Sequence, residues 1–68
     1  MYRDDVISSE MSRQNLTDTA LAEITGLTRQ KIGELRTGTA KDPKLSTLTA
    51  VATGLGIDLQ KLVEPRAA

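Results

Sequence analysis

The chain has 68 residues, enough for one small domain, and a domain of this size buries only about 60% of the surface that its unfolded chain exposes. It contains no Cys, His, Trp or Phe, which excludes disulfides, thiolate or imidazole metal sites and histidine-dependent nucleophilic catalysis. We therefore expect a protein that is not an enzyme and needs no cofactor or metal. The longest uncharged run, 45–57, is shorter than the roughly 20 apolar residues of a membrane span, and the first residues lack the apolar core of a signal peptide. A cytoplasmic protein without membrane contact is expected.

The formal net charge is zero, but the charges are divided unevenly along the chain. Residues 1–23 hold two arginines against five acids, a net charge of −3, whereas residues 29–44 hold five basic residues against two acids, a net charge of +3. Such a dipole can turn one face toward a polyanion while the opposite face limits non-specific binding. The neutral total therefore does not exclude nucleic acid as a partner.

The first predicted helix covers residues 3–14. Val6 or Ile7, together with Met11, forms its inward side at helical spacing. Asn15 follows, and Asn is the residue that best replaces Gly in the left-handed position after a helix. We expect Asn15 to close this helix.

Residues 18–37 predict two short helices joined at Gly26. The residues expected to face inward are Leu21, Ala22, Ile32 and Leu35. Two helices that cross steeply over a short turn need a small residue at the crossing, which Ala22 supplies. Gly26 accepts a positive φ without a Cβ penalty and so ends the first helix within one residue. The stretch therefore predicts a helix-turn-helix.

One local pattern marks three helix starts: an apolar residue, a capping residue, and a second apolar residue four positions after the cap. The caps are Thr17, Thr28 and Asp58. The apolar pairs around them are Leu16 and Leu21, Leu27 and Ile32, and Ile57 and Leu62. The last of these starts predicts a short helix over 59–63.

Residues 38–44 form the expected long loop, with Gly38 ending the preceding helix. Asp42 followed by Pro43 has the form of a cap and a first-turn proline, which would start the next helix, a boundary fixed only to within about two residues. The apolar face of that helix is expected to pack on the helix-turn-helix and to consist of Leu45, Leu48, Ala52 and Leu55.

Residues 16–63 resemble the Cro/repressor-type helix-turn-helix domain, the XRE family. The likeness rests on LTDTALAEITGLTRQKIGELRTG at 16–38, on Pro43, Leu45, Leu48 and Ala52, and on LGIDLQKLV at 55–63. It implies an all-α fold, a compact five-helix lambda-repressor-like bundle with helices 2 and 3 as the helix-turn-helix. We expect one such domain over 1–64 and a flexible tail over 65–68. The family tends to place a capping Ser where Lys44 stands, so a later start of the fourth helix stays open.

In helix-turn-helix docking, the second helix lies in the major groove with its amino-terminal residues at the base edges. The expected base-contacting positions are Arg29, Gln30, Gly33 and Glu34. Arg29 can donate to guanine O6 and N7, and Gln30 can pair with adenine N6 and N7, each worth about 1–3 kcal/mol of discrimination. The alternative is that both are solvated polar residues of a first turn.

Glu34 and Gly33 each have more than one interpretation. Glu34 can accept from cytosine N4, repel phosphate and so reduce non-specific binding, or be an ordinary surface residue. Gly33 costs about 1 kcal/mol relative to Ala in a helix; it either permits a close approach to a base pair or marks a weak recognition helix.

Phosphate contacts are expected from threonines near the helix starts and from the basic segment. The candidates are Thr17, Thr28, Lys31, Arg36, Thr39, Lys41 and Lys44. For any single lysine, a solvated surface charge is the alternative. So few contacts imply modest affinity and a shallow salt dependence.

Two positions depart from the family pattern. Asp18 stands where many members have Gln at the start of helix 2, and an acid there would face phosphate. Arg36 stands where the family often has Glu paired with an Arg of helix 1, a position that Met11 occupies here. The resemblance therefore implies that Arg36 is released toward Glu10 or DNA.

The leading hypothesis is a sequence-specific regulator of transcription that binds double-stranded DNA, of the small phage, prophage or plasmid repressor type. A homodimer, or one that forms only on DNA, would bind half-sites roughly 34 Å apart, with Tyr2, Leu59 and Val63 supplying apolar contact. A chain cut from a longer protein also fits. The alternative class is a protein-interaction module, such as the antitoxin of a toxin–antitoxin pair or a transcriptional adaptor, which the neutral charge and Asp18 favour slightly.

Overall fold

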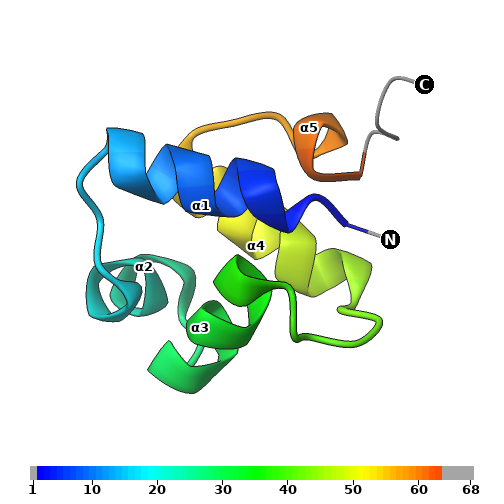
Figure 1. The fold of residues 1–68 in the computed structure, drawn as a ribbon, viewed down its shortest axis with the longest axis horizontal. Helices are drawn as coiled ribbons and strands as arrows, with labels where there is room; N and C mark the ends of the chain where they lie inside the picture. Colours follow the sequence, from blue (N-terminus) through cyan, green and yellow to red (C-terminus); the bar gives the residue numbers. More distant parts are fainter. Residues whose placement is uncertain (1, 64–68) are drawn as a thin grey trace.

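The structure is a computed structural model that describes residues 2–63; the other residues, including the tail expected at 65–68, lie outside this part. The described chain is all-helical and folds as α1 (Asp4–Arg13), α2 (Asp18–Thr25), α3 (Arg29–Thr37), α4 (Leu45–Leu55) and α5 (Gln60–Val63) (Figure 1). The expected all-α fold and its five helices are confirmed, and the first and last helices begin one residue later than predicted. Between residues 2 and 63, no helix is both long enough and apolar enough to cross a membrane.

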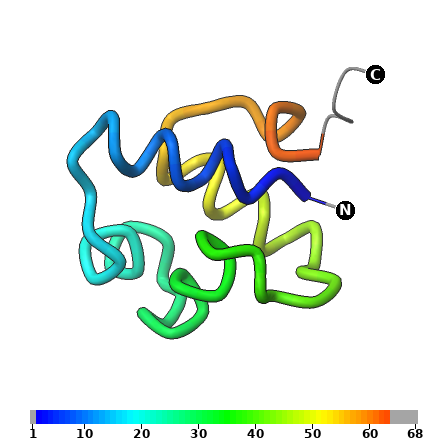
Figure 2. Tube along the Cα trace, viewed as in Figure 1, coloured from blue at the N-terminus to red at the C-terminus, as the bar shows by residue number. Residues whose placement is uncertain are grey.

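The helix α1 lies across the bundle and contacts α3, α4 and α5, while α2 packs against α3 and α4 (Figures 1 and 2). Hydrogen bonds fix both ends of α1. At its amino end, the backbone N–H of Arg3 donates to the Leu62 carbonyl at 2.6 Å. At its carboxyl end, the Gln14 side-chain amide donates to the Leu55 carbonyl, also at 2.6 Å. α1 is thus held to α5 at one end and to the end of α4 at the other, and the helix-turn-helix packs on α1 and α4.

The ends of the helices follow the local rules of the sequence. The hydroxyl oxygens of Thr17 and Thr28 accept from the backbone N–H groups of Ala20 and Lys31, each at 3.1 Å, and so cap α2 and α3. After α1, α2 and α3 the chain turns through left-handed residues, which are Asn15 (φ 58°), Gly26 (φ 79°) and Gly38 (φ 82°). The predicted caps Thr17 and Thr28 and the predicted helix-ending residues Asn15, Gly26 and Gly38 are thus confirmed.

The core draws on every helix of the described chain. Its buried members are Ile7, Met11, Leu21, Ala22, Ile32, Leu35, Leu48, Val51, Ala52, Leu55 and Leu62. Of the two alternatives in the first helix, Ile7 is fully buried, whereas Val6 is half-buried against the core. In each predicted apolar pair the residue after the cap is fully buried and the one before it packs half-buried against the core.

Two expectations for α4 are wrong. Asp42 does not cap it, because its left-handed backbone (φ 45°) does not fit an N-cap, and the cap position is instead Lys44, which makes no side-chain capping bond. Leu45 is 62% exposed, while Val51, not expected inside, is fully buried. Leu45 is the first residue of α4, and a helical side chain tilts toward the amino end, which carries it beyond the edge of the core.

Candidate nucleic-acid interface

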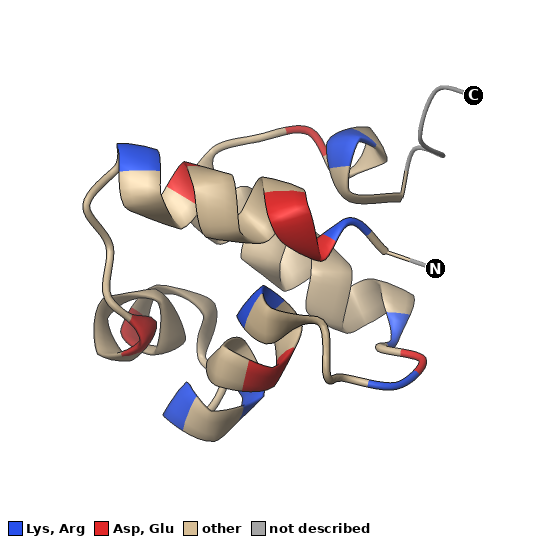
Figure 3. Cartoon of the chain, in the orientation of Figure 1, with Lys and Arg blue, Asp and Glu red and all other residues tan. Residues whose placement is uncertain are grey.

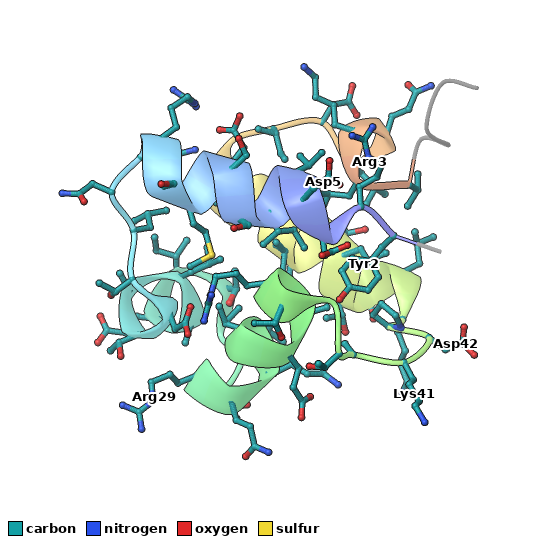
Figure 4. The ribbon with its side chains drawn as sticks, viewed as in Figure 1. Tyr2, Arg3, Asp5, Arg29, Lys41 and Asp42 are labelled. Atoms are coloured by element: carbon teal, nitrogen blue, oxygen red, sulfur yellow. The ribbon has the colours of Figure 1, made fainter. Side chains whose placement is uncertain are left out.

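The amino end of α3 is exposed to solvent. Arg29, the first residue of α3, points away from the rest of the bundle (Figure 4), and both Arg29 and Gln30 are exposed. The turn before them is short, since α2 ends at Thr25 and α3 begins at Arg29. A helix end that is held by its cap and still reaches outward has the geometry for insertion into a groove.

Buried residues fix the rotation of α3 about its axis. Ile32 and Leu35 are fully buried, and at 3.6 residues per turn the opposite side of the helix carries Gln30, Gly33 and Glu34. Gly33 and Glu34 are half-buried. The structure thus brings the four expected base-contacting residues together on the outward side and amino end of α3. Their contacts with bases stay a prediction.

The residues expected to contact phosphate are placed around α3. Thr17 and Thr28 stand at the amino ends of α2 and α3, where first-turn N–H groups have no partner within the helix. Lys41 and Lys44 are exposed in the loop before α4, and Figure 4 shows Lys41 pointing outward from it. Thr39 is exposed at the start of the same loop, with its hydroxyl 3.1 Å from that of Thr37.

The positive charges of this region are mostly uncompensated. Arg29, Lys31, Lys41 and Lys44 form no ion pair with any residue between 2 and 63. Arg13, outside the region, does pair: its Nη2 lies 2.6 Å from Glu10 Oε1, and this bond together with one from Gln14 lowers the pKa of Glu10. In Figure 3, basic residues lie along α3 and in the next loop with acidic residues among them, and acidic residues also lie at the start of α1.

Arg36 forms an ion pair with Asp18, which sequence reasoning missed. The Nε and Nη2 groups of Arg36 donate to the two carboxylate oxygens of Asp18 at 2.9 and 3.1 Å. These hydrogen bonds raise the pKa of Arg36. Arg36 is therefore not released toward Glu10, and Asp18 does not face outward as an isolated charge. One feature of the sequence could have predicted this pair: Asp18 and Arg36, the two residues that depart from the family pattern, carry opposite charges.

This arrangement defines a helix-turn-helix protein whose second helix presents a basic, exposed amino end. A family model described as Cro/C1-type HTH DNA-binding domain matches residues 6–67, and the chain belongs to this family. No curated protein and no solved structure matches the chain. The family match confirms the resemblance found at residues 16–63 and extends it over most of α1. It identifies the chain as a DNA-binding domain.

Proposed function

We propose that the protein is a sequence-specific regulator of transcription that binds double-stranded DNA and reads the major groove with the amino end of α3. The observation that carries this proposal is the exposure of Arg29 and Gln30 on a helix whose rotation is fixed by the buried Ile32 and Leu35. Arginine and glutamine are the side chains that pair in bidentate fashion with guanine and adenine. A repressor of the small phage, prophage or plasmid type is the form of regulator that we favour.

The charge distribution supports the same orientation. The uncompensated cations lie on α3 and in the loop that follows it, so this face attracts the phosphate backbone. Glu34 and Asp42 in the same region reduce the attraction. We therefore expect the affinity for DNA to depend more on the base contacts of α3 than on the overall charge.

Binding as a homodimer, or as one that assembles only on DNA, is part of the proposal. Of the three residues expected to supply apolar contact, Tyr2 and Leu59 pack against the core of their own chain. Val63, at the end of α5, is 40% exposed and is the one left to contact a second copy. A two-fold dimer would bind half-sites about one helical turn apart.

A protein-interaction module, such as an antitoxin or a transcriptional adaptor, is the second candidate. The observation that favours it is the exposure of large apolar side chains at Ile24 and Leu45, which are 55% and 62% accessible. Exposed apolar surface of this kind can mark a protein contact when it is contiguous, but scattered single residues are normal on any surface. The DNA reader remains the better-supported candidate.

Selection of bound sites from a random pool of DNA duplexes tests the proposal directly. We expect enrichment of one short motif, repeated as a palindrome if the protein binds as a dimer. Gel shifts on the selected duplex at two salt concentrations should show weaker binding at the higher one, as counterion release requires. Absence of any retained duplex at low salt would contradict the proposal and leave the interaction module.

A further inference from the structure

We propose that Asp18 is a positioning residue for DNA binding, because its carboxylate holds the guanidinium of Arg36 in place to donate to a DNA phosphate. This inference rests on the proposed function and adds to it the way in which α2 and α3 act together on the DNA backbone. Asp18 would thus favour DNA binding, although its negative charge by itself opposes it.

The ion pair occupies only part of the Arg36 guanidinium. A guanidinium has five N–H groups in a planar fork, and two of them, one on Nε and one on Nη2, donate to Asp18. The remaining three have no hydrogen-bond partner among residues 2–63. The Arg36 side chain is 39% exposed. Because the fork is rigid, two bonds along one edge fix the direction of the donors that stay open.

The pair lies at the border of the proposed reading surface. Arg29, Gly33 and Arg36 follow one another at spacings of four and three residues, so they form one stripe along α3. Asp18 of α2 lies beside this stripe, since its Oδ2 atom would be 3.6 Å from a Cβ placed on Gly33. In helix-turn-helix docking the first of the two helices crosses the DNA backbone. Because its guanidinium bonds to the first residue of α2, Arg36 of α3 joins the proposed reader helix to the helix expected to cross the DNA backbone.

Two physical effects of Asp18 oppose each other. Its negative charge repels the polyanion, which by itself would make its removal favourable. Its two hydrogen bonds, however, order a long side chain before DNA arrives, so that less conformational freedom is lost on binding. Since the charge is already compensated by Arg36 in a bidentate pair, we expect the ordering effect to be larger. Removing the acid should therefore weaken binding.

The test uses the selected duplex and three variants of the full chain: Asp18→Asn, Arg36→Ala and the double variant. We expect Asp18→Asn to lower the affinity by roughly two- to tenfold. Arg36→Ala should lower it as well and reduce the slope of log K against log salt by about 0.9, the value for one phosphate contact. In the Arg36→Ala background, Asp18→Asn should leave the affinity unchanged or raise it. A purely structural role of Asp18 would instead weaken binding in both backgrounds.

Asp42→Asn is the matched control. Asp42 is an acid of the same basic segment, it is exposed, and it forms no ion pair with the described residues. Asn also tolerates the left-handed backbone at this position. Its substitution removes one negative charge without affecting an arginine, so the affinity should rise or stay the same. A loss of affinity on Asp18→Asn without any loss on Asp42→Asn would support the positioning role.

Asp18→Asn that binds as tightly as the parent chain, or more tightly, would overturn the inference while the proposed function stood. A parent chain that retains no duplex would overturn both. If circular dichroism shows that Asp18→Asn is unfolded, Arg36→Lys takes its place, because lysine keeps the charge but lacks the planar fork. Reduced affinity of the folded Arg36→Lys chain supports the inference, and unchanged affinity overturns it.

Discussion

Gly54 of α4 lies so close to Thr25 of α2 that a Cβ on the glycine would be only 2.8 Å from the Thr25 Cγ2 atom. The same Cβ would be 3.2 Å from Cγ2 of Ile24. The absence of a side chain at Gly54 thus allows α4 to pack directly against the end of α2, immediately before the turn at Gly26. The position of the first helix of the helix-turn-helix depends on this contact.

Gly54→Ala should therefore destabilise the domain. In a helix, Ala is favoured over Gly by about 1 kcal/mol, but forcing a methyl group into a packed contact typically costs about 1–3 kcal/mol. The Thr25 hydroxyl donates to the Leu21 carbonyl at 2.8 Å, which holds the side chain in its rotamer, so we expect the packing cost to exceed the gain. Thermal unfolding followed by circular dichroism measures the difference. An unchanged or higher melting temperature would contradict the close approach of α4 to α2.

Gly33→Ala is the matched change, and we expect it to stabilise the domain where Gly54→Ala destabilises it. Gly33 also lies inside a helix, but a Cβ there would meet only Asp18 Oδ2, at the ordinary contact distance of 3.6 Å. The helix propensity of Ala should then raise the stability by up to about 1 kcal/mol, or roughly 4–8 °C in melting temperature for a domain of this size.

DNA binding by the same variant separates the two interpretations of Gly33. If the bare position permits close approach to a base pair, Gly33→Ala should melt at a higher temperature and bind the selected duplex more weakly. If Gly33 only weakens the helix, the variant should gain stability with no loss of affinity. A lower melting temperature would contradict the packing described around Gly33.

The ionisation of Tyr2 should make the fold sensitive to alkaline pH. The Tyr2 hydroxyl donates to the Leu35 carbonyl at 2.9 Å, and Figure 4 shows the ring directed toward the end of α3. Burial, and then the charge of Asp4, raise the pKa of Tyr2 above its ordinary value of 10.0. A pKa raised by folding means that the neutral form stabilises the fold. This contribution is complete below pH 10.0 and is lost as the pH rises through the folded pKa.

Spectrophotometric titration can measure this pKa without interference, because Tyr2 is the sole aromatic residue of the chain. The midpoint for phenolate formation should lie higher in the folded protein than in denaturant. Tyr2→Phe removes the ionisable group and should lose the alkaline decline in stability, with a cost of about 0.5–1.5 kcal/mol at neutral pH for the missing hydrogen bond. Equal midpoints in the folded and denatured chain would disprove the expected effect of burial.

The features predicted correctly from sequence depend on residues close together in the chain. The caps at Thr17 and Thr28 bond to N–H groups three positions later, and the left-handed turn at Gly26 is set by the conformational preference of one residue. The exposure of Leu45 and the burial of Val51 depend instead on where α4 begins relative to the core. The sequence leaves that start open, because neither Asp42 nor Lys44 provides a side-chain cap.

In the candidate site, too, features set by residues close together in the chain were predicted, and features set by helix packing were not. The outward position of Gln30 follows from the buried Ile32 and Leu35 on the same helix, so helical periodicity is enough to predict it. The pairing of Asp18 with Arg36 joins two helices across 18 positions in the chain. It depends on the angle at which α2 and α3 cross, and no local rule gives that angle.

Arg29→Ala and Lys44→Ala together test the division between base and phosphate contacts. Arg29 projects from the amino end of α3, and its loss should cost about 1–3 kcal/mol on the selected duplex and relax the preference at one base pair. Lys44, at the cap position of α4, should contact only phosphate, so its loss should weaken binding to all sequences about equally and reduce the salt slope by about one. Both side chains are exposed and form no ion pair within residues 2–63, so both variants should keep the melting temperature of the parent chain.

Competition gel shifts against duplexes changed at single base pairs measure the two effects separately. The position read by Arg29 should be the one at which the Arg29→Ala chain no longer discriminates, while Lys44→Ala retains the full pattern at lower affinity. If Arg29→Ala binds with unchanged affinity and unchanged preference, α3 does not enter the groove by its amino end. In that case Gln30, one residue further along the same exposed turn, would lose its assignment as well.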